Sequence, residues 1–378
     1  MPNKWEVFGK MKPWITYGES LITFDIFRRP PKMGICIFLT LFVTVIGCIF
    51  CLNFILNNFN GELTPTIVFS ATVCIAMLDI PIKVILGHLH REELHQLSAW
   101  INGFHEEEIE NYELNLIAGK MINKFDKLWF ICFKTYHILF ICTDVTYTIF
   151  SFFTSGKNGI LIEIPFAPET FPGYKGAMLL MQLMVLLSAA INSVFYDSII
   201  GLIGLELMAN LDVIHDYILS NRDRIQDNPQ FLRTVLKRYC KVIKHINIFN
   251  DTFNIVIFFR LFMSLLLNLT GIFVIRENID DIPIYFAQLC IIFQILIPCL
   301  FCEIIVNKTE RISAVLYQTN WYDLGVKDQK AFILALGMTQ RNYGMKAAGM
   351  YDVNIYTFIQ IIKLAISYCA LLYTFTAK

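Results

Sequence analysis

The sequence predicts an all-α membrane protein of seven transmembrane helices, with a cytoplasmic N-terminus, an extracellular C-terminus and a layer of cytoplasmic helices that anchors the bundle. The first observation is composition: 56% of the 378 residues are hydrophobic, 16% are charged, and the mean hydropathy is +0.55. A soluble domain does not need so many apolar residues to fill its core. The other observations are seven long apolar stretches and an uneven placement of Lys and Arg. The 31 basic and 31 acidic residues cancel, so no nucleic-acid partner is predicted.

The clearest span is Gly34–Leu56, which has 23 residues and no charged side chain. A helix needs ~20 such residues to cross the ~30 Å hydrocarbon core of a bilayer. Six further stretches are long enough: Pro65–Leu86, Leu128–Phe153, Ala177–Leu205, Phe253–Ile275, Ile284–Val306 and Ile355–Phe375. They divide the chain into a cytoplasmic N-terminal segment (1–33), spans one to six (34–306), a cytoplasmic anchor segment (307–354), and the last span with a short extracellular tail (355–378).

Lys and Arg lie almost entirely on one side of these spans. The N-terminus and the second-to-third, fourth-to-fifth and sixth-to-seventh connections hold six, four, seven and six of them, 23 in all, against four on the opposite side. Cytoplasmic connections retain positive charge, so the N-terminus is predicted inside and the C-terminus outside. The N-terminal segment is polar, contains four prolines and shows no cleavable signal sequence.

Two cytoplasmic connections are predicted to be helical. Apolar residues recur every three or four positions between Leu232 and Ile246, just before the fifth span. We therefore expect helices four and five to extend into the cytosol. A second amphipathic stretch, near Ala331–Arg341, precedes the last span and predicts a cytoplasmic helical layer that joins spans four to seven.

Ionisable residues inside a membrane are costly, and they suggest function by default. Asp79 and Lys83 are four residues apart, so they can pair on one helical face. Asp144 and Arg260 lie deeper in their spans, and either structural pairing or a functional role is open for each. The remaining three lie near predicted cytoplasmic ends and are expected to extend to the interface: Lys134, Asp197 and Glu206.

No catalytic set is found, so neither an enzyme nor a cofactor is predicted. His88 and His90 lie at a membrane exit without further ligands at metal-binding spacing, which favours interfacial solvation. The acidic run Glu106–Glu108 is expected to be a solvated surface. Ten of the eleven cysteines fall inside apolar spans and Cys240 falls in a basic loop, so no extracellular disulfide is expected.

The last span has one polar side. At 100° per residue, five positions share a stripe: Gln360, Lys363, Ser367, Leu371 and Thr374. Apolar residues, among them Ile362, Leu364, Ala365, Ile366, Cys369 and Leu372, cover much of the rest. The polar stripe must face protein or water, so it forms either a seam between helices or the lining of a pore.

The C-terminal quarter contains a specific pattern. Tyr317 and Trp321 precede a helix that ends at Gln340 and Arg341, and the run Phe358-Ile-Gln-Ile-Ile-Lys-Leu-Ala-Ile-Ser-Tyr-Cys-Ala-Leu-Leu follows. This pattern resembles the signature of insect odorant receptors. The number of spans, the inside N-terminus, the long fourth-to-fifth connection and the short outside tail also fit, so the likeness covers essentially the whole chain.

The resemblance implies a ligand-gated, non-selective cation channel of four subunits in the plasma membrane of sensory neurons, surrounded by lipid. An odorant-tuned subunit assembles with a common co-receptor subunit, and the last helix lines the pore. The chain lacks the enlarged second cytoplasmic loop of co-receptors, so it looks like a tuning subunit. Ser367, Leu371 and Thr374 are the implied pore residues, with Leu371 at a narrow gate near the extracellular end.

The resemblance also implies an odorant pocket in the outer half of the subunit, among spans two to six. In span three, hydroxyls and aromatic rings recur every three or four residues, a pattern that suits a small, aromatic, weakly polar volatile. The candidate ligand-binding residues, chosen by depth and by rough alignment with the family pattern, are Thr72, Val73, Thr143, Thr146, Tyr147, Phe150, Leu187, Ala190, Tyr285 and Gln288.

Three other classes of membrane protein are alternatives to an odorant receptor. A G-protein-coupled receptor would place its N-terminus outside and usually carries an Asp-Arg-Tyr-like triplet and an Asn-Pro-x-x-Tyr run, which are missing here. A transporter would favour inverted repeats and glycine-broken helices. A gustatory receptor shares the predicted architecture, and only the sequence of the last span favours an odorant receptor over it.

Overall fold

The computed structural model describes residues 5–25, 30–59, 64–106, 112–153, 160–164, 173–223, 225, 230–277, 282–341 and 343–376. Apart from one two-stranded hairpin, the regular elements in these ranges are helices. They are, in order, α1 (Trp5–Thr23), α2 (Pro31–Asn58), α3 (Pro65–Leu89), α4 (Arg91–Glu106), α5 (Tyr112–Phe153), α6 (Tyr174–Ser220), α7 (Phe231–Glu277), α8 (Ile282–Tyr317), the 3₁₀ turn η1 (Trp321–Asp323), α9 (Val326–Thr339), β1 (Lys346–Ala347), β2 (Tyr351–Asp352) and α10 (Ile355–Thr376).

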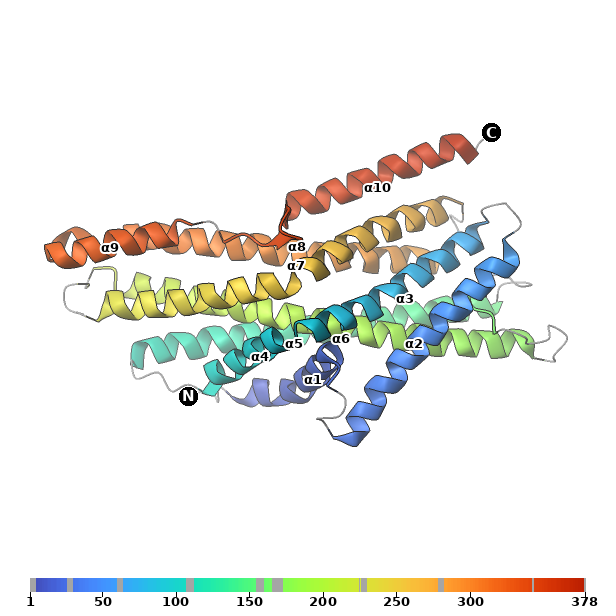
Figure 1. The fold of residues 1–378 in the computed structure, drawn as a ribbon, viewed down its shortest axis with the longest axis horizontal. Coiled ribbons are helices and arrows are strands. Elements are labelled where there is room, and N and C mark those ends of the chain that lie inside the picture. Colours follow the sequence, from blue (N-terminus) through green and yellow to red (C-terminus); the bar gives the residue numbers. More distant parts are fainter. Residues whose placement is uncertain are drawn as a thin grey trace.

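The predicted all-α fold is confirmed, whereas the orientation of the two termini stays a prediction. Six helices, α2, α3, α5, α6, α7 and α8, are long and apolar enough to cross a membrane, and the shorter apolar helix α10 coincides with the predicted seventh span. Each predicted span begins and ends inside one of these helices. The helices lie roughly along the long axis of the molecule (Figure 1).

Several helices are much longer than a bilayer requires. Helices α6 and α7 have 47 residues each and α5 has 42, whereas ~20 residues are enough to cross the hydrocarbon core. The predicted extension of the fourth and fifth spans is therefore confirmed in length. Helix α9 begins at Val326, five residues before the predicted amphipathic stretch, and ends at Thr339.

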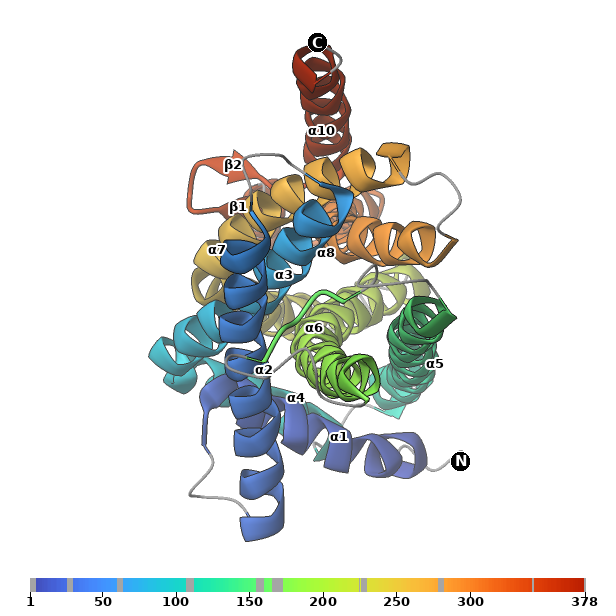
Figure 2. The same ribbon diagram turned by 90° about the vertical axis from the view of Figure 1, so that its right-hand side faces the viewer.

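The N-terminal segment is a packed helix, which the sequence analysis did not predict. Helix α1 contains Pro13, yet Met11, Leu21 and Ile22 have no exposed surface. Its partners are α3, α4, α5 and α6, so the apolar face of this short polar helix is covered by residues far along the chain. Figure 2 shows α1 crossing the bundle beside α4 and near the N-terminal end of α2.

Helix α6 forms the centre of the bundle. It packs against α1, α2, α5, α7 and α8, and its buried residues continue from Ser188 almost without interruption to Ile218. A helix that is apolar on all sides belongs inside a bundle or a membrane. The main hydrophobic core therefore follows α6 along the end that is predicted to be cytoplasmic.

The antiparallel hairpin β1–β2 positions α10. Lys346 pairs with Asp352 and Ala347 with Tyr351, and the turn between them uses positive φ angles at Ala348 (50°) and Gly349 (71°). The backbone N–H of Ala348 donates to the carbonyl of Asn254 on α7, 3.1 Å away. Asn354 caps the next helix, because its Oδ1 accepts from the Thr357 N–H at 2.9 Å. The hairpin thus fixes the position of the start of α10 relative to α7.

The predicted orientation leads to a glycosylation test. Two natural sequons on the side predicted to be cytoplasmic, at Asn250 and Asn307, lie inside α7 and α8, and their threonines, Thr252 and Thr309, are buried. The absence of a glycan at either site could therefore reflect burial as well as a cytoplasmic position. New sequons in the connections between helices report the side of the membrane without this ambiguity. Glu62→Thr creates Asn-Gly-Thr in the connection predicted to be extracellular, and we expect a glycan there that shifts the gel mobility and is removed by an endoglycosidase.

The matched control is Asp223→Thr, which creates Asn-Arg-Thr after α6, on the side predicted to be cytoplasmic. It should gain no glycan. The reverse result, a glycan with Asp223→Thr and none with Glu62→Thr, would invert the predicted topology.

Candidate ligand cavity and pore helix

A cavity of ≈150 Å³ lies between five of the membrane-spanning helices. Helices α3, α5, α6, α7 and α8 all contribute to its wall, as does the segment 160–164. Its lining is mainly apolar and aromatic, with a few polar groups: Phe69, Thr72, Val73, Ala76, Met77, Asp79, Ile80, Phe140, Thr143, Asp144, Tyr147, Leu161, Leu186, Ala189, Ala190, Ser193, Leu267, Ala287, Cys290, Ile291 and Gln294. Such a composition is typical of small-molecule sites.

Half of the candidate ligand-binding residues line this cavity. These are Thr72, Val73, Thr143, Tyr147 and Ala190. The other five, Thr146, Phe150, Leu187, Tyr285 and Gln288, are not among the lining residues. Phe150 and Tyr285 are 37% and 42% exposed on the surface of the chain. A role in odorant binding stays a prediction for all ten.

Several lining residues lie one helical step away from the candidates that the sequence suggested. In α5 the stripe that faces the cavity is Phe140, Thr143, Asp144 and Tyr147, whereas the predicted stripe began at Thr143. For Asp144 the sequence offers one signal, which is an ionisable residue deep in its span. For Gln294 on α8 no signal was found.

The polar groups of the cavity are few and partly committed. The Thr72 hydroxyl donates to the Val68 carbonyl at 2.9 Å, and the Thr143 hydroxyl donates to the Leu139 carbonyl at 2.9 Å. Each hydroxyl oxygen keeps a lone pair that a ligand can use. Asp144 Oδ2 is buried and has no hydrogen-bond partner among the described residues, so it can accept a hydrogen bond from a ligand hydroxyl.

An aromatic pair closes the cavity on the side of α3. The rings of Phe69 and Tyr147 lie 5.0 Å apart and are tilted by 50°, which is a favourable geometry for two aromatic side chains. Both rings present apolar surface to the cavity. The site is therefore suited to a small, flat, largely apolar molecule with one hydrogen-bonding group.

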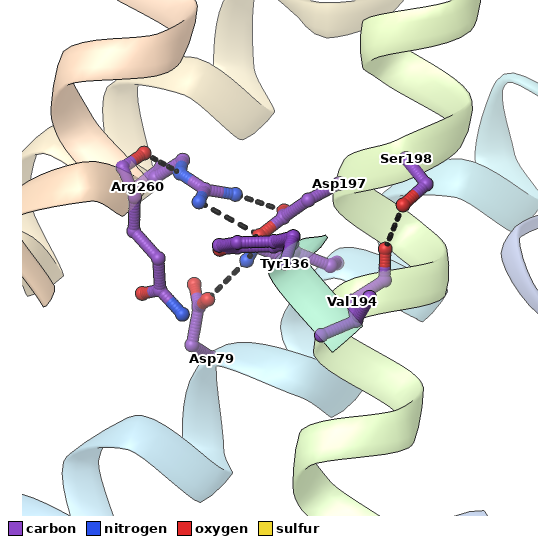
Figure 3. A network of polar contacts seen from close by, with 8 residues as sticks. Asp79, Tyr136, Val194, Asp197, Ser198 and Arg260 are labelled. Carbon is purple, nitrogen blue, oxygen red and sulfur yellow. Dashed lines mark hydrogen bonds and ion pairs between the residues drawn. The ribbon is translucent and has the colours of Figure 1, made fainter. Parts of the chain in front are cut away.

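A buried network of four charged residues adjoins the cavity at Asp79, which belongs to both. Figure 3 shows Asp79, Asp197 and Arg260 of this network together with Tyr136. Arg260 on α7 forms a two-pronged pair with Asp197 on α6, in which the Nη2–Oδ2 distance is 2.8 Å. Lys83 on α3 pairs with Asp79 and lies 3.6 Å from Asp197 Oδ1. Tyr136 on α5 donates to Asp197 Oδ2 at 3.2 Å. Two acids and two bases cancel, so the network has no net charge.

The network also reaches α8, because Arg260 Nε donates to the carbonyl of Gln294 at 2.9 Å. Five helices are thus joined at one level of the bundle. On its other side is a second cavity of ≈220 Å³, whose lining includes Trp129, Tyr136, Asp197, Arg260 and Phe301. Gln294 borders both cavities.

The structure shows which predictions about the ionisable residues are correct. The predicted pairing of Asp79 with Lys83 is confirmed, and Arg260 makes a structural pair with Asp197. The prediction that Asp197 and Glu206 extend to the interface is wrong. The side chain of Asp197 is only 11% exposed and that of Glu206 only 2%, because partners on other helices compensate their burial better than a stretch toward the interface would.

Gln288 has a structural contact in place of a position in the cavity. Its Nε2 donates to Asn268 Oδ1 at 2.7 Å, which joins α8 to α7 by a buried amide pair. A Cβ atom on Gly271 would lie 1.9 Å from Gln288 Oε1, so a larger residue at this position would displace the Gln288 amide from its contact with Asn268.

Helix α10 is attached to the bundle along one face only. It contacts α7 and α8, and the residues it buries there are Ala365 and Cys369, with exposures of 0% and 4%. Ser367 is exposed and its hydroxyl donates to the Lys363 carbonyl at 2.9 Å. Leu371 is 51% exposed, and the side chain of Thr374 lies outside the described residues. The outer half of α10 stands away from the other helices (Figures 1 and 2).

The two histidines considered for a metal site have other contacts. His88 Nδ1 lies 2.8 Å from the Thr23 carbonyl, and His90 Nδ1 lies 4.0 Å from a Glu93 carboxylate oxygen. Neither histidine belongs to a group of possible metal ligands among the described residues. All eleven cysteines are free in the structure.

The fold and the cavity define a multi-span membrane protein with room for a small ligand. A family model described as "7tm Odorant receptor" matches residues 63–366. Because the match covers most of the sequence, the chain belongs to the 7tm odorant receptor family. This membership sets aside the G-protein-coupled, transporter and gustatory alternatives.

Curated relatives and solved structures agree with the family. Odorant receptor 42b of Drosophila melanogaster is 20% identical over 371 residues, which cover 89% of this chain and 87% of the relative. Putative odorant receptor 92a of the same species is 18% identical over 151 residues, 39% and 37% of the two chains.

The structure of the olfactory receptor OR5 from Machilis hrabei in complex with eugenol superposes with a TM-score of 0.76 at 12% identity, covering 98% of this chain and 100% of that one. Another structure of OR5 gives a TM-score of 0.74 at 11% identity, with 96% and 98% covered. At these identities the likeness establishes the fold.

Proposed function

We propose that this chain is the odorant-tuning subunit of a heteromeric, odorant-gated cation channel in the plasma membrane of sensory neurons, with the odorant co-receptor as its partner. The observation that carries the proposal is the cavity of ≈150 Å³ between α3, α5, α6, α7 and α8 in a member of the odorant receptor family. In this proposal a small volatile occupies the cavity and changes the packing of the helices around it.

The lining favours one class of ligand. Apolar burial against Phe69 and Tyr147 supplies most of the binding free energy, and the Asp144 carboxylate accepts one hydrogen bond. A small aromatic alcohol or phenol has both features. Eugenol, the ligand in the OR5 complex, belongs to this chemical class and is a suitable first probe.

The exposed face of α10 supports the proposed channel. Ser367, Leu371 and Thr374 would line a central pore formed with the last helices of neighbouring subunits, including those of the co-receptor. An apolar ring at Leu371 can close such a pore by excluding water, because an ion there loses its hydration shell without replacement. Lys363 lies about 12 Å from Leu371 at the helical rise of ~1.5 Å per residue, in a wider vestibule where water screens its charge.

The test is odorant-evoked current in cells that express this chain with and without the co-receptor, across a panel of small aromatic volatiles. Current is expected only with both subunits. Tyr147→Ala removes one wall of the cavity, and we expect the half-maximal odorant concentration to rise by about tenfold to a hundredfold through lost apolar burial.

Phe150→Ala is the matched control, since Phe150 is an aromatic residue one turn further along α5 that does not line the cavity. It should leave the dose response unchanged. Equal responses of both variants and the wild type, with normal surface expression, would show that the odorant binds elsewhere. No current with any ligand in the presence of the co-receptor would contradict the channel itself.

A further inference from the structure

Three side chains of metal-ligating type converge in the part of the bundle that is predicted to be cytoplasmic, and none of them lines either cavity. His105 lies near the end of α4, Asp126 lies on α5 and Glu206 lies on α6. One ligand atom of each lies within 4.8 Å of the others, and His105 Nε2 is 2.9 Å from Glu206 Oε1. The three residues are only 1%, 1% and 2% exposed.

Most polar atoms of this cluster have no partner. Among the described residues, none forms a hydrogen bond to His105 Nδ1, to either carboxylate oxygen of Asp126 or to Glu206 Oε2. Buried polar groups are normally satisfied, and a buried carboxylate without a partner is strongly unfavourable. A bound cation would accept the lone pairs of these four atoms.

Neighbouring cations do not fill this role. Lys308, whose Nζ lies 5.7 Å from the centre of the Phe125 ring, is paired with Asp212. Lys124 is exposed, and its Nζ lies 5.8 Å from the centre of the same ring. No ion pair among the described residues includes Asp126 or joins a Lys or Arg to Glu206. No Lys or Arg side chain among the described residues therefore compensates the carboxylates of the cluster.

We propose that His105, Asp126 and Glu206 bind a divalent transition metal ion, with zinc as the preferred ion. One imidazole nitrogen and two carboxylate oxygens are ligands that zinc accepts, and three protein ligands leave a fourth position for water or for a second carboxylate oxygen. Two ionised carboxylates and a neutral imidazole compensate the charge of one Zn²⁺, so the occupied site is neutral. This proposal does not depend on the proposed odorant function.

The surroundings fix the histidine and exclude water. The Phe8 ring of α1 stacks on the His105 imidazole, with ring centres 3.8 Å apart and an angle of 17° between the planes. The imidazole is thereby held at the cluster by a residue from a fourth helix. An ion at this point would join α4, α5 and α6 directly and α1 through Phe8. Because the ligands come from separate helices and are buried, the ion would be taken up as the chain folds.

The test measures metal content in the full-length chain, expressed with zinc in the medium and purified alone in detergent, so that no second subunit contributes metal. We expect about one zinc ion per chain by mass spectrometry. Asp126→Asn and Glu206→Gln should lose most of it. Asp212→Asn is the matched control, because it changes a carboxylate on α6 that is paired with Lys308, and it should retain the zinc.

A second measurement covers the case in which the ligand variants do not fold. Wild-type chain expressed in cobalt-supplemented, zinc-depleted medium should show the visible d–d absorption of Co²⁺ bound to nitrogen and oxygen ligands. A monodisperse wild-type chain that contains neither zinc nor cobalt would overturn the proposal, and it would indicate that the two carboxyl groups share a proton. Retention of zinc by a monodisperse Asp126→Asn chain would also overturn it.

Discussion

Replacing Asp197 by Asn is expected to destabilise the receptor by about 3–5 kcal/mol, because it leaves a buried positive charge without its counter-ion. The Arg260 guanidinium is held by both Asp197 oxygens, and the same carboxylate accepts from Tyr136 and attracts Lys83. An amide can replace neither the charge nor the two-pronged geometry. The measurement is the thermal midpoint of the detergent-solubilised receptor together with its surface expression, and both should fall.

Two further variants show whether the charge or the packing is responsible. Asp223→Asn breaks the exposed contact between Arg222 and Asp223, which are 44% and 71% exposed, and it should change stability by less than about 1 kcal/mol. The double variant Asp197→Leu with Arg260→Met removes both charges and should recover much of the lost stability. A thermal midpoint of Asp197→Asn equal to that of the wild type would refute the network's structural role.

Cysteine accessibility along α10 is expected to give the second large effect. With Ser367→Cys, Leu371→Cys or Thr374→Cys co-expressed with the co-receptor, a charged thiol reagent applied from outside should suppress most of the odorant-evoked current. A bulky charged adduct in a narrow pore blocks the passage of ions. Ala365→Cys is the matched control, since Ala365 has no exposed surface and faces α7 and α8, and its current should be unaffected.

The parent protein for this experiment must lack other cysteines that the thiol reagent can reach. Four natural cysteines are exposed in the chain and would be replaced by Ser: Cys36, Cys132, Cys142 and Cys240. If all three variants on the polar stripe keep full current after treatment, despite normal surface expression, the stripe is a seam between helices and the pore lies elsewhere.

The spans could be predicted from the sequence, but the rotation of each helix about its axis could not. A run of ~20 apolar residues is a strong signal for a span. Helix α5, however, exposes Ile149 and Phe150 and turns Tyr147 toward the cavity, although all three are large and mainly apolar. Lipid and protein interior attract the same side chains, so hydropathy does not fix the rotation of α5, and the predicted stripe extends one turn past the residues that line the cavity.

Contacts between residues that are far apart in the sequence could not be predicted either. Asp79 and Lys83 are four residues apart, and this spacing was enough to predict their pair. Asp197 and Arg260 are 63 residues apart, and nothing in a single sequence joins them. The burial of α1 depends in the same way on α6, so a polar segment with four prolines gave no sign that it would be packed.

The place of α1 in the core has a consequence for synthesis. Gly18 packs against Ile199, so about 180 residues must be made before this contact can form. At ~5–20 residues per second that takes roughly 10–40 s. During this interval Met11, Leu21 and Ile22 have no partner on α6, and the first helix of the chain must wait at the membrane surface. The N-terminal end, although made first, completes its folding only after the fourth span has been inserted.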